Sequence, residues 1–152
     1  MNKNLKRGLS FAAVAATAAM LLTACAPATF KAEDCKDAKL SLGSLLPTTG
    51  NLAFLGAPEI AGVDLAVKEI NENGGVAGAC VSVLHKDSGD TTTNTASQSE
   101  AALKSAGVDA IVGAASSGVT LSVIDKVIKD EIVQVSPANT APVLSTYKDN
   151  GF

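Results

Sequence analysis

The chain has 152 residues, of which 47% are hydrophobic, 18% charged and 3% aromatic, and its formal net charge is −3. This length can form a core without disulfide bonds, and the apolar fraction is too high for a disordered chain. The acidic balance argues against a nucleic-acid-binding protein, and the scarcity of aromatic side chains argues against a carbohydrate platform.

The first 24 residues have the pattern of a secretory signal peptide. Three basic residues within the first seven positions precede an apolar run from about Leu9 to Leu22 that contains no acidic residue. The run ends in Leu22-Thr23-Ala24-Cys25, which resembles the lipobox of bacterial lipoprotein precursors. That resemblance implies cleavage before Cys25 and a diacylglyceryl group on its sulfur, which would hold the protein at a membrane surface. The alternative is an ordinary cleaved signal peptide with an incidental cysteine.

Removal of this segment leaves 128 residues with a net charge of −6, because it carries three positive charges and no negative one. Residues 25–37 are expected to form a short tether. Cys35 and Cys80 each precede a predicted strand, and these strands are residues 39–46 and 81–86. If the two strands are parallel neighbours, both thiols lie at one edge of the sheet, within bridging distance in an exported compartment. Two free buried thiols are the alternative.

From residue 38 onward, predicted strands alternate with predicted helices. Apolar runs and apolar residues at helical spacing, together with glycines that end helices, define these elements. The strands are expected at residues 39–46, 81–86, 109–114 and 132–135, and the helices at 58–73, 93–106 and 118–129. This order predicts an α/β fold with a doubly wound parallel sheet that is covered on both faces.

Motifs of common enzyme classes are absent from the sequence or incomplete. No glycine-rich dinucleotide turn follows the first strand, and no P-loop pattern occurs. Residues 114–118 differ by one residue from a nucleophile elbow, but His85 is the only histidine of the chain. The cysteines are not closely spaced, which argues against a metal site. We therefore expect no catalytic residue, no metal and no cofactor.

Polar groups are predicted to gather where the strands end, because ligands of parallel sheets bind outside the carboxyl ends of the strands. Ser116 and Ser117 directly precede a predicted helix, whose N-terminus favours an anion such as a carboxylate. A simple N-cap role is the alternative for Ser117. The loops expected at this edge, called here the carboxyl edge, are residues 47–56, 87–92, 114–118 and 136–141.

The last of these loops contains Pro137 and is followed directly by Pro142, which stiffen it, and it displays the Ala138 backbone and the Thr140 hydroxyl. The alternative for Thr140 is a solvated turn hydroxyl. Because this loop and the helix start at Ser117 are predicted to share one sheet edge, a binding role for Ser116, Ser117, Ala138 and Thr140 is favoured.

Four segments in order resemble the type I periplasmic binding proteins of the branched-chain amino acid class, which are the receptors of ABC importers. The likeness runs from Lys39 to Phe152. The segments that carry it are residues 45–50 (Leu-Leu-Pro-Thr-Thr-Gly), 69–76 (Glu-Ile-Asn-Glu-Asn-Gly-Gly-Val), 111–117 (Ile-Val-Gly-Ala-Ala-Ser-Ser) and 135–142 (Val-Ser-Pro-Ala-Asn-Thr-Ala-Pro).

This resemblance implies roles for individual residues. Ser117 matches the serine that takes the ligand carboxylate, while Ala138 and Thr140 match the backbone and hydroxyl partners of the carboxylate and the α-ammonium group. The family often places an aromatic residue near the ligand side chain, in the loop after the first strand. Phe54 and Leu55 occupy that region here. Because Leu55 is not aromatic, the identity of the ligand side chain stays open.

The family fold has two lobes and a chain well over twice as long, so residues 38–152 are expected to be part of the N-terminal lobe of a longer protein. The alternative is a relic of such a protein. The resemblance implies a lipid-anchored, extracytoplasmic substrate-binding protein that delivers an amino acid or similar small carboxylate to ABC permease subunits. The alternative is a ligand sensor or an enzyme built on the same lobe.

Overall fold

The computed structural model describes residues 40–149, which form one parallel sheet with helices on both faces. The strand order is β2-β1-β3-β4, and every neighbouring pair is parallel. The strands are β1 (Leu40–Leu46), β2 (Val81–Asp87), β3 (Ala110–Gly113) and β4 (Val133–Val135). All four predicted strands are therefore confirmed to within one residue at each end, apart from Lys39, which lies outside the described residues.

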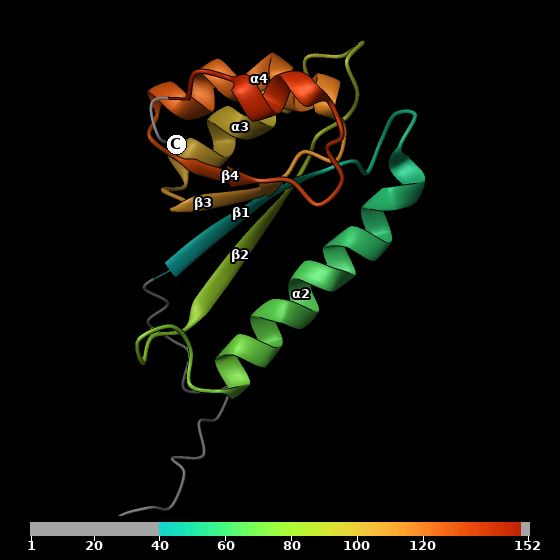
Figure 1. Ribbon diagram of the computed structural model, residues 1–152. Coiled ribbons are helices and arrows are strands. Elements are labelled where there is room, and N and C mark those ends of the chain that lie inside the picture. The colour runs from blue at the N-terminus through green and yellow to red at the C-terminus, as the bar shows by residue number, and fades with distance from the viewer. Residues whose placement is uncertain (1–39, 150–152) are drawn as a thin grey trace, which may run out of the picture.

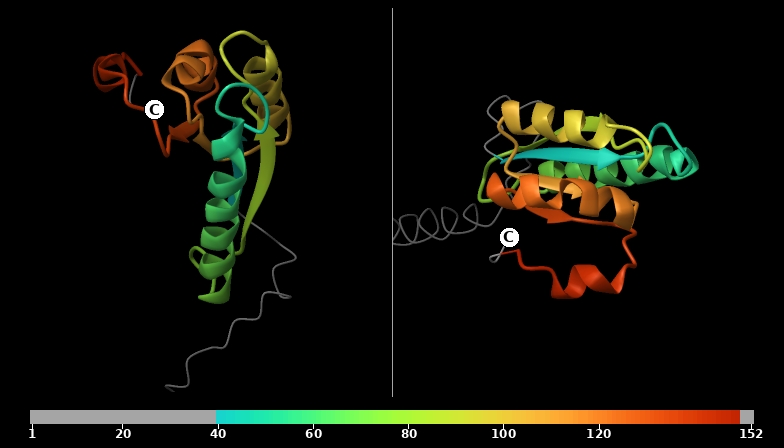
Figure 2. Two further views of the ribbon diagram at one scale, coloured as in Figure 1. Left: turned by 90° about the vertical axis from the view of Figure 1, so that its right-hand side faces the viewer. Right: turned by 90° about the horizontal axis from the view of Figure 1, so that it is seen from above.

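The helices are distributed as right-handed crossovers between parallel strands require. Helix α2 covers one face of β1 and β2, whereas α3 and α4 contact each other on the opposite face (Figures 1 and 2). The helices are α2 (Gly56–Glu72), α3 (Thr95–Ser105) and α4 (Ser117–Lys129), with short 3-10 helices η2 (Ala53–Leu55) and η3 (Pro142–Thr146). The doubly wound α/β fold is thus confirmed.

Two helix starts differ from the prediction for identifiable reasons. Helix α2 begins at Gly56 rather than at Pro58, because a proline is tolerated in the first turn, where backbone N–H groups have no helical partner. Helix α3 begins two residues later than predicted, because the Thr93 N–H donates to the Asp90 carbonyl 3.4 Å away and completes a turn instead.

The main core lies between the sheet and the α3–α4 layer. Its members come from the inward face of the strands and from the apolar stripes of the two helices. The buried cluster consists of Leu45, Ala96, Leu103, Val108, Ile111, Ala114, Val119, Val123, Val127 and Ile132. This layer fixes the first turn of α4, which carries the predicted binding serines.

The expected strand geometry around the cysteines is confirmed as far as the structure describes it. Strands β1 and β2 are parallel neighbours, with Leu40 opposite Val81. Cys80, directly before β2, is disulfide-bonded. Cys35 lies outside the described residues, so its pairing with Cys80 stays a prediction. The predicted signal peptide, the lipidated Cys25 and the tether also lie outside residues 40–149, and within that range no helix could span a membrane.

Candidate functional site

The carboxyl ends of the strands meet in register, as the prediction of a common edge requires. Leu46, the last residue of β1, lies opposite Asp87, the last residue of β2. On the other side of β1, Leu45 lies opposite Gly113 of β3. A Cβ atom on Gly113 would lie 2.1 Å from the Leu45 carbonyl oxygen, and the residue has a φ of +129°, so only glycine fits there. The loops of the carboxyl edge therefore leave the sheet side by side.

Asp87 anchors the first of these loops. Its Oδ1 accepts hydrogen bonds from the backbone N–H groups of Thr48 (2.8 Å), Thr49 (3.1 Å) and Gly89 (2.9 Å), and its Oδ2 accepts one from the Thr49 hydroxyl (2.5 Å). Partial burial by itself raises the pKa of this carboxyl, but the hydrogen bonds outweigh burial and lower the pKa to about 2. Asp87 thus holds the Thr48–Thr49 turn against the end of β2.

Replacement of Asp87 by asparagine is expected to flatten the acid dependence of stability. Because the pKa is lowered in the folded chain, ionised Asp87 stabilises the fold above its ordinary pKa of 3.8, and that contribution is lost as the pH falls toward about 2. Urea unfolding at a series of pH values across this window measures the effect. Thr49→Val removes one of the four hydrogen bonds and should produce part of the same loss. An Asp87→Asn protein with the wild-type acid slope would contradict this role.

Ser117 connects the start of α4 to the loop at residues 136–141. Its Oγ accepts hydrogen bonds from the backbone N–H groups of Thr140 (3.0 Å) and Ala141 (3.2 Å). Ser116, with φ −81° and ψ 126°, occupies the N-cap position, and its side chain makes no capping hydrogen bond. The N-cap alternative for Ser117 is therefore wrong, since Ser117 is the first residue of the helix and its hydroxyl faces the loop.

A second hydroxyl, that of Ser136, ties the same loop to the end of β3. It donates to the Ala114 carbonyl oxygen (2.6 Å) and accepts from the N–H groups of Ala138 (3.2 Å) and Asn139 (3.0 Å). The Ala138 N–H is thereby used within the loop, so its carbonyl oxygen is the backbone group left for a ligand. Ser136 was not among the predicted site residues, although a serine that begins a turn is the signal that could have identified it.

The arrangement suits a small molecule with a carboxylate and an amino group. The Ser117 hydroxyl accepts two hydrogen bonds and still has its own proton to donate to an anion. It lies in the first turn of α4, where backbone N–H groups lack helical partners and the helix dipole favours negative charge. Thr140 is exposed beside it. Of the predicted site residues, Ser117 and Thr140 are in direct contact, while Ser116 and Ala138 flank them along the chain.

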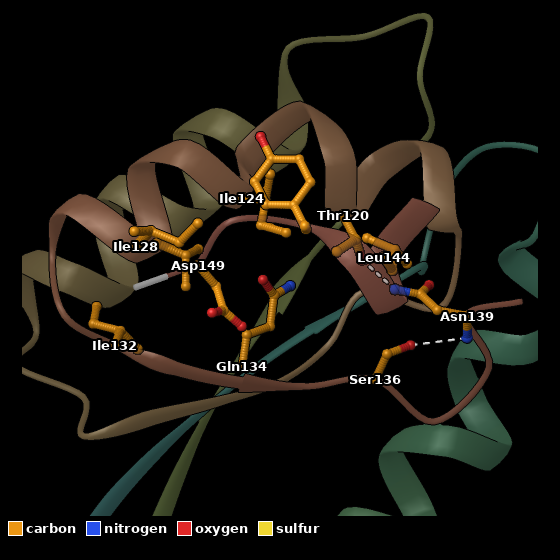
Figure 3. Close-up of a pocket in the computed structure, with 11 residues that line it drawn as sticks. Thr120, Ile124, Ile128, Ile132, Gln134, Ser136, Asn139, Leu144 and Asp149 are labelled. Atoms are coloured by element: carbon orange, nitrogen blue, oxygen red, sulfur yellow. Dashed lines mark hydrogen bonds between the residues drawn. The ribbon is translucent and has the colours of Figure 1, made fainter. Parts of the chain in front are cut away.

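A separate cavity of about 250 Å³ lies behind the loop at residues 136–141, between α4, β4 and the segment that contains η3 (Figure 3). Asn139 spans its wall, because its Nδ2 donates to Thr120 Oγ1 over 2.8 Å. None of the four predicted site residues lines this cavity. Its lining consists of Thr120, Ile124, Val127, Ile128, Ile132, Gln134, Ser136, Asn139, Leu144, Tyr147 and Asp149.

Phe54, the aromatic residue in the loop after β1, is 73% exposed, so its ring is accessible to a ligand.

His85, the only histidine of the sequence, lies between a serine and an aspartate. The His85 Nδ1 is 2.6 Å from the Ser44 hydroxyl oxygen, and its Nε2 is 2.9 Å from Asp64 Oδ1, so both ring nitrogens have partners other than the serines of residues 114–118. Ser44 is fully buried, so its hydroxyl cannot reach a substrate. This Ser–His–Asp chain joins β1, β2 and α2.

Sequence comparison identifies relatives of the same class. The chain is 33% identical to the chemotactic signal transduction system substrate-binding protein BasB of Halobacterium salinarum over 109 aligned residues. These residues make up 70% of this chain and 26% of BasB. It is 31% identical over 109 residues to the Leu/Ile/Val-binding protein BraC3 of Rhizobium johnstonii, and the alignment covers 71% of this chain and 29% of BraC3. The chain therefore spans less than a third of these relatives.

Structure comparison agrees with the sequence comparison. The branched-chain amino acid transporter substrate-binding protein LivJ of Streptococcus pneumoniae, solved with isoleucine, matches with a TM-score of 0.65 and 33% identity, over 70% of this chain and 31% of that protein. The leucine-binding protein LivK of Thermotoga maritima matches with a TM-score of 0.61 and 25% identity, over 70% of this chain and 29% of LivK.

The family assignment rests on the whole of the folded region. A family model described as periplasmic binding protein matches residues 39–152, which include every strand and helix described above. The solved relatives include substrate-binding proteins of branched-chain amino acid transporters. From its sequence segments, its parallel sheet and these matches together, the chain belongs to the periplasmic binding protein family, and resembles in particular the class that serves branched-chain amino acid ABC transporters.

Proposed function

We propose that this chain belongs to an extracytoplasmic substrate-binding protein of an ABC importer, which binds a branched-chain amino acid or a similar small carboxylate. In this proposal the ligand carboxylate lies at the first turn of α4, where it accepts hydrogen bonds from the Ser117 and Thr140 hydroxyls. The α-ammonium group donates to the Ala138 carbonyl oxygen. Ser116 contributes through its place at the N-cap, and Cys25 carries the lipid that anchors the protein to the membrane.

The observation that carries the proposal is the contact between Ser117 and the loop at residues 136–141. Two backbone N–H groups, from Thr140 and Ala141, point at one serine oxygen at a helix N-terminus. This contact supports the proposal because it holds the backbone of Thr140 beside the first turn of α4. Solved relatives of the family were crystallised with isoleucine and with leucine, which have the expected carboxylate and amino groups.

Ligand sensing is a second candidate, and one relative favours it. BasB, at 33% identity, is a substrate-binding protein of a chemotactic signal transduction system. Both candidates require reversible binding of an unaltered ligand, so they differ in the partner rather than in the site. Deletion of the gene would abolish uptake of the labelled amino acid in the first case, and would abolish movement toward it in the second.

Calorimetric titration of the full-length protein with L-isoleucine, L-leucine and L-isoleucinamide tests the ligand chemistry. The two amino acids are expected to bind. Isoleucinamide is expected to bind at least about tenfold more weakly, because a neutral amide forfeits the charge-assisted hydrogen bonds at the α4 N-terminus. Equal affinity for isoleucine and its amide would overturn the placement of a carboxylate there, and conversion of either ligand would overturn the assignment to a binding protein.

A further inference from the structure

Helices α3 and α4 enclose a carboxyl group that plays no part in the proposed binding site. Glu100 lies in the middle of α3 and is 2% exposed. Among the described residues, its Oε1 atom has no hydrogen-bond partner. Burial of an ionised carboxylate in such a position has a large desolvation free energy that no hydrogen bond to this oxygen offsets, whereas burial of a neutral carboxylic acid costs much less. The position therefore favours a proton on Glu100.

Asp130, the C-cap residue that follows α4, provides the acceptor for that proton. A hydrogen bond to the Asp130 side chain is among the causes that raise the pKa of Glu100. The Asp130 side chain is 9% exposed. Asp130 Oδ1 also pairs with the ammonium group of Lys104, one turn along α3 from Glu100. The C-terminus of a helix disfavours a negative charge, so a second carboxylate beside Asp130 would be repelled by both the dipole and the first charge.

The positive charges nearby do not neutralise both carboxyls. Lys104 is 54% exposed and is paired with Asp130, and the ammonium group of Lys126 on α4 donates to the Ser97 hydroxyl. Within residues 40–149, the charged groups that act on Glu100 are Asp130, Lys126 and Lys104, and none comes from strands β1 and β2 beneath α3. Burial first, and Asp130 next, raise the pKa of Glu100 above its ordinary value of 4.5 in spite of the two lysines.

We propose that Glu100 and Asp130 share one proton in the folded protein, and that this proton fastens α3 to the C-terminal end of α4. Protonated Glu100 donates its O–H to the Asp130 carboxylate, which also accepts from Lys104. The other Glu100 oxygen becomes a neutral carbonyl, whose burial without a partner costs less than that of a carboxylate oxygen. No covalent bond changes, and the proton exchanges with solvent.

This shared proton makes the α3–α4 layer sensitive to pH. The folded-state pKa of Glu100 lies above the unfolded value, so the stabilisation is complete below about the ordinary pKa of 4.5. It is lost as the pH rises through the folded-state pKa. This dependence of stability on pH is opposite in sign to that of Asp87. Because Asp130 lies at the other end of α4 from Ser117, the shared proton can be tested independently of the proposed ligand.

Glu100→Gln tests the proposal because glutamine does not titrate but keeps an N–H donor for Asp130. Thermal unfolding of the full-length wild type and variant is compared at about pH 4.5 and about pH 8. The wild type is expected to melt at least about 2 °C below the variant at the higher pH, with the difference closing at the lower pH. Glu72→Gln, on the exposed face of α2, controls for the loss of a carboxyl group as such. A melting difference between wild type and Glu100→Gln that does not change with pH would overturn the proposal.

Infrared difference spectroscopy provides a readout that does not depend on stability. The wild type minus Glu100→Gln spectrum is expected to contain the C=O stretch of a protonated carboxyl, and this band should persist at pH values above the ordinary pKa of 4.5. If Glu100→Gln fails to fold, Asp130→Asn replaces it, because loss of the Asp130 charge frees Lys104 to pair with an ionised Glu100 and should remove the same band. A wild-type spectrum without that band would overturn the shared proton.

Discussion

Ser117→Ala is expected to weaken binding of L-isoleucine by the full-length protein by about 1–3 kcal/mol. The substitution removes the hydroxyl that would donate to the ligand carboxylate. It also leaves the N–H groups of Thr140 and Ala141 without the oxygen that accepts them at 3.0 and 3.2 Å. The loop that carries Thr140 then loses its attachment to α4, so both direct and positioning contributions disappear together. Isothermal titration measures the loss.

Two variants separate those contributions. Thr140→Val removes a hydroxyl but keeps the N–H bond to Ser117, so its effect isolates the direct contact. Ser122→Ala makes the same chemical change five residues further along α4, where the hydroxyl bonds only to the Val119 carbonyl of its own helix, and it should leave affinity unchanged. Wild-type affinity in both Ser117→Ala and Thr140→Val would remove these residues from the binding site.

Leu103→Ala is expected to lower the free energy of unfolding by about 2–5 kcal/mol. Leu103 is fully buried in the core between α3 and the sheet. A Cβ atom placed on Gly43 of β1 would lie 2.8 Å from the Leu103 side chain, so the leucine fills the space that glycine leaves open on the strand. Truncation creates a cavity there that the sheet cannot collapse into, because its register is fixed on both sides of β1.

Leu121→Ala is the matched control for this prediction, since Leu121 lies on the exposed side of α4. A surface substitution of this kind is expected to change stability by no more than about 0.5 kcal/mol. Urea unfolding of both variants gives the comparison. Equal losses in the two variants would show that the α3 side of the sheet is not the main core of the fold.

The strands and the sheet class could be predicted from the sequence because their signals are strong and local. Short apolar runs that alternate with segments of helical periodicity predict parallel strands without any tertiary information. Residues 109–114 and 132–135 are two such runs. Right-handed crossovers then determine which face each helix covers. The largest shifts, of two residues, are at the starts of α2 and α3, where Pro58 and the Asp90–Thr93 turn decided the first helical residue.

The candidate site could be predicted only in part, because its remaining members act through contacts between distant segments. Asp87 holds the Thr48–Thr49 turn across 38 and 39 residues of sequence, and Ser136 reaches Ala114 across 22. A single aspartate or serine at a loop start gives no sign of which backbone groups it will meet. Ser117 and Thr140 could be predicted as neighbours because the strand order brings their loops to one edge, but the direction of the Ser117 hydroxyl depends on where α4 begins.

A crystal structure of the full-length protein with L-isoleucine would show where the ligand carboxylate lies. The ligand carboxylate is expected at the first turn of α4, within hydrogen-bond distance of the Ser117 and Thr140 hydroxyls, with the α-ammonium group on the Ala138 carbonyl oxygen. A carboxylate bound elsewhere, such as in the cavity lined by Asn139 and Tyr147, with the Ser117 hydroxyl directed only at the loop, would contradict it.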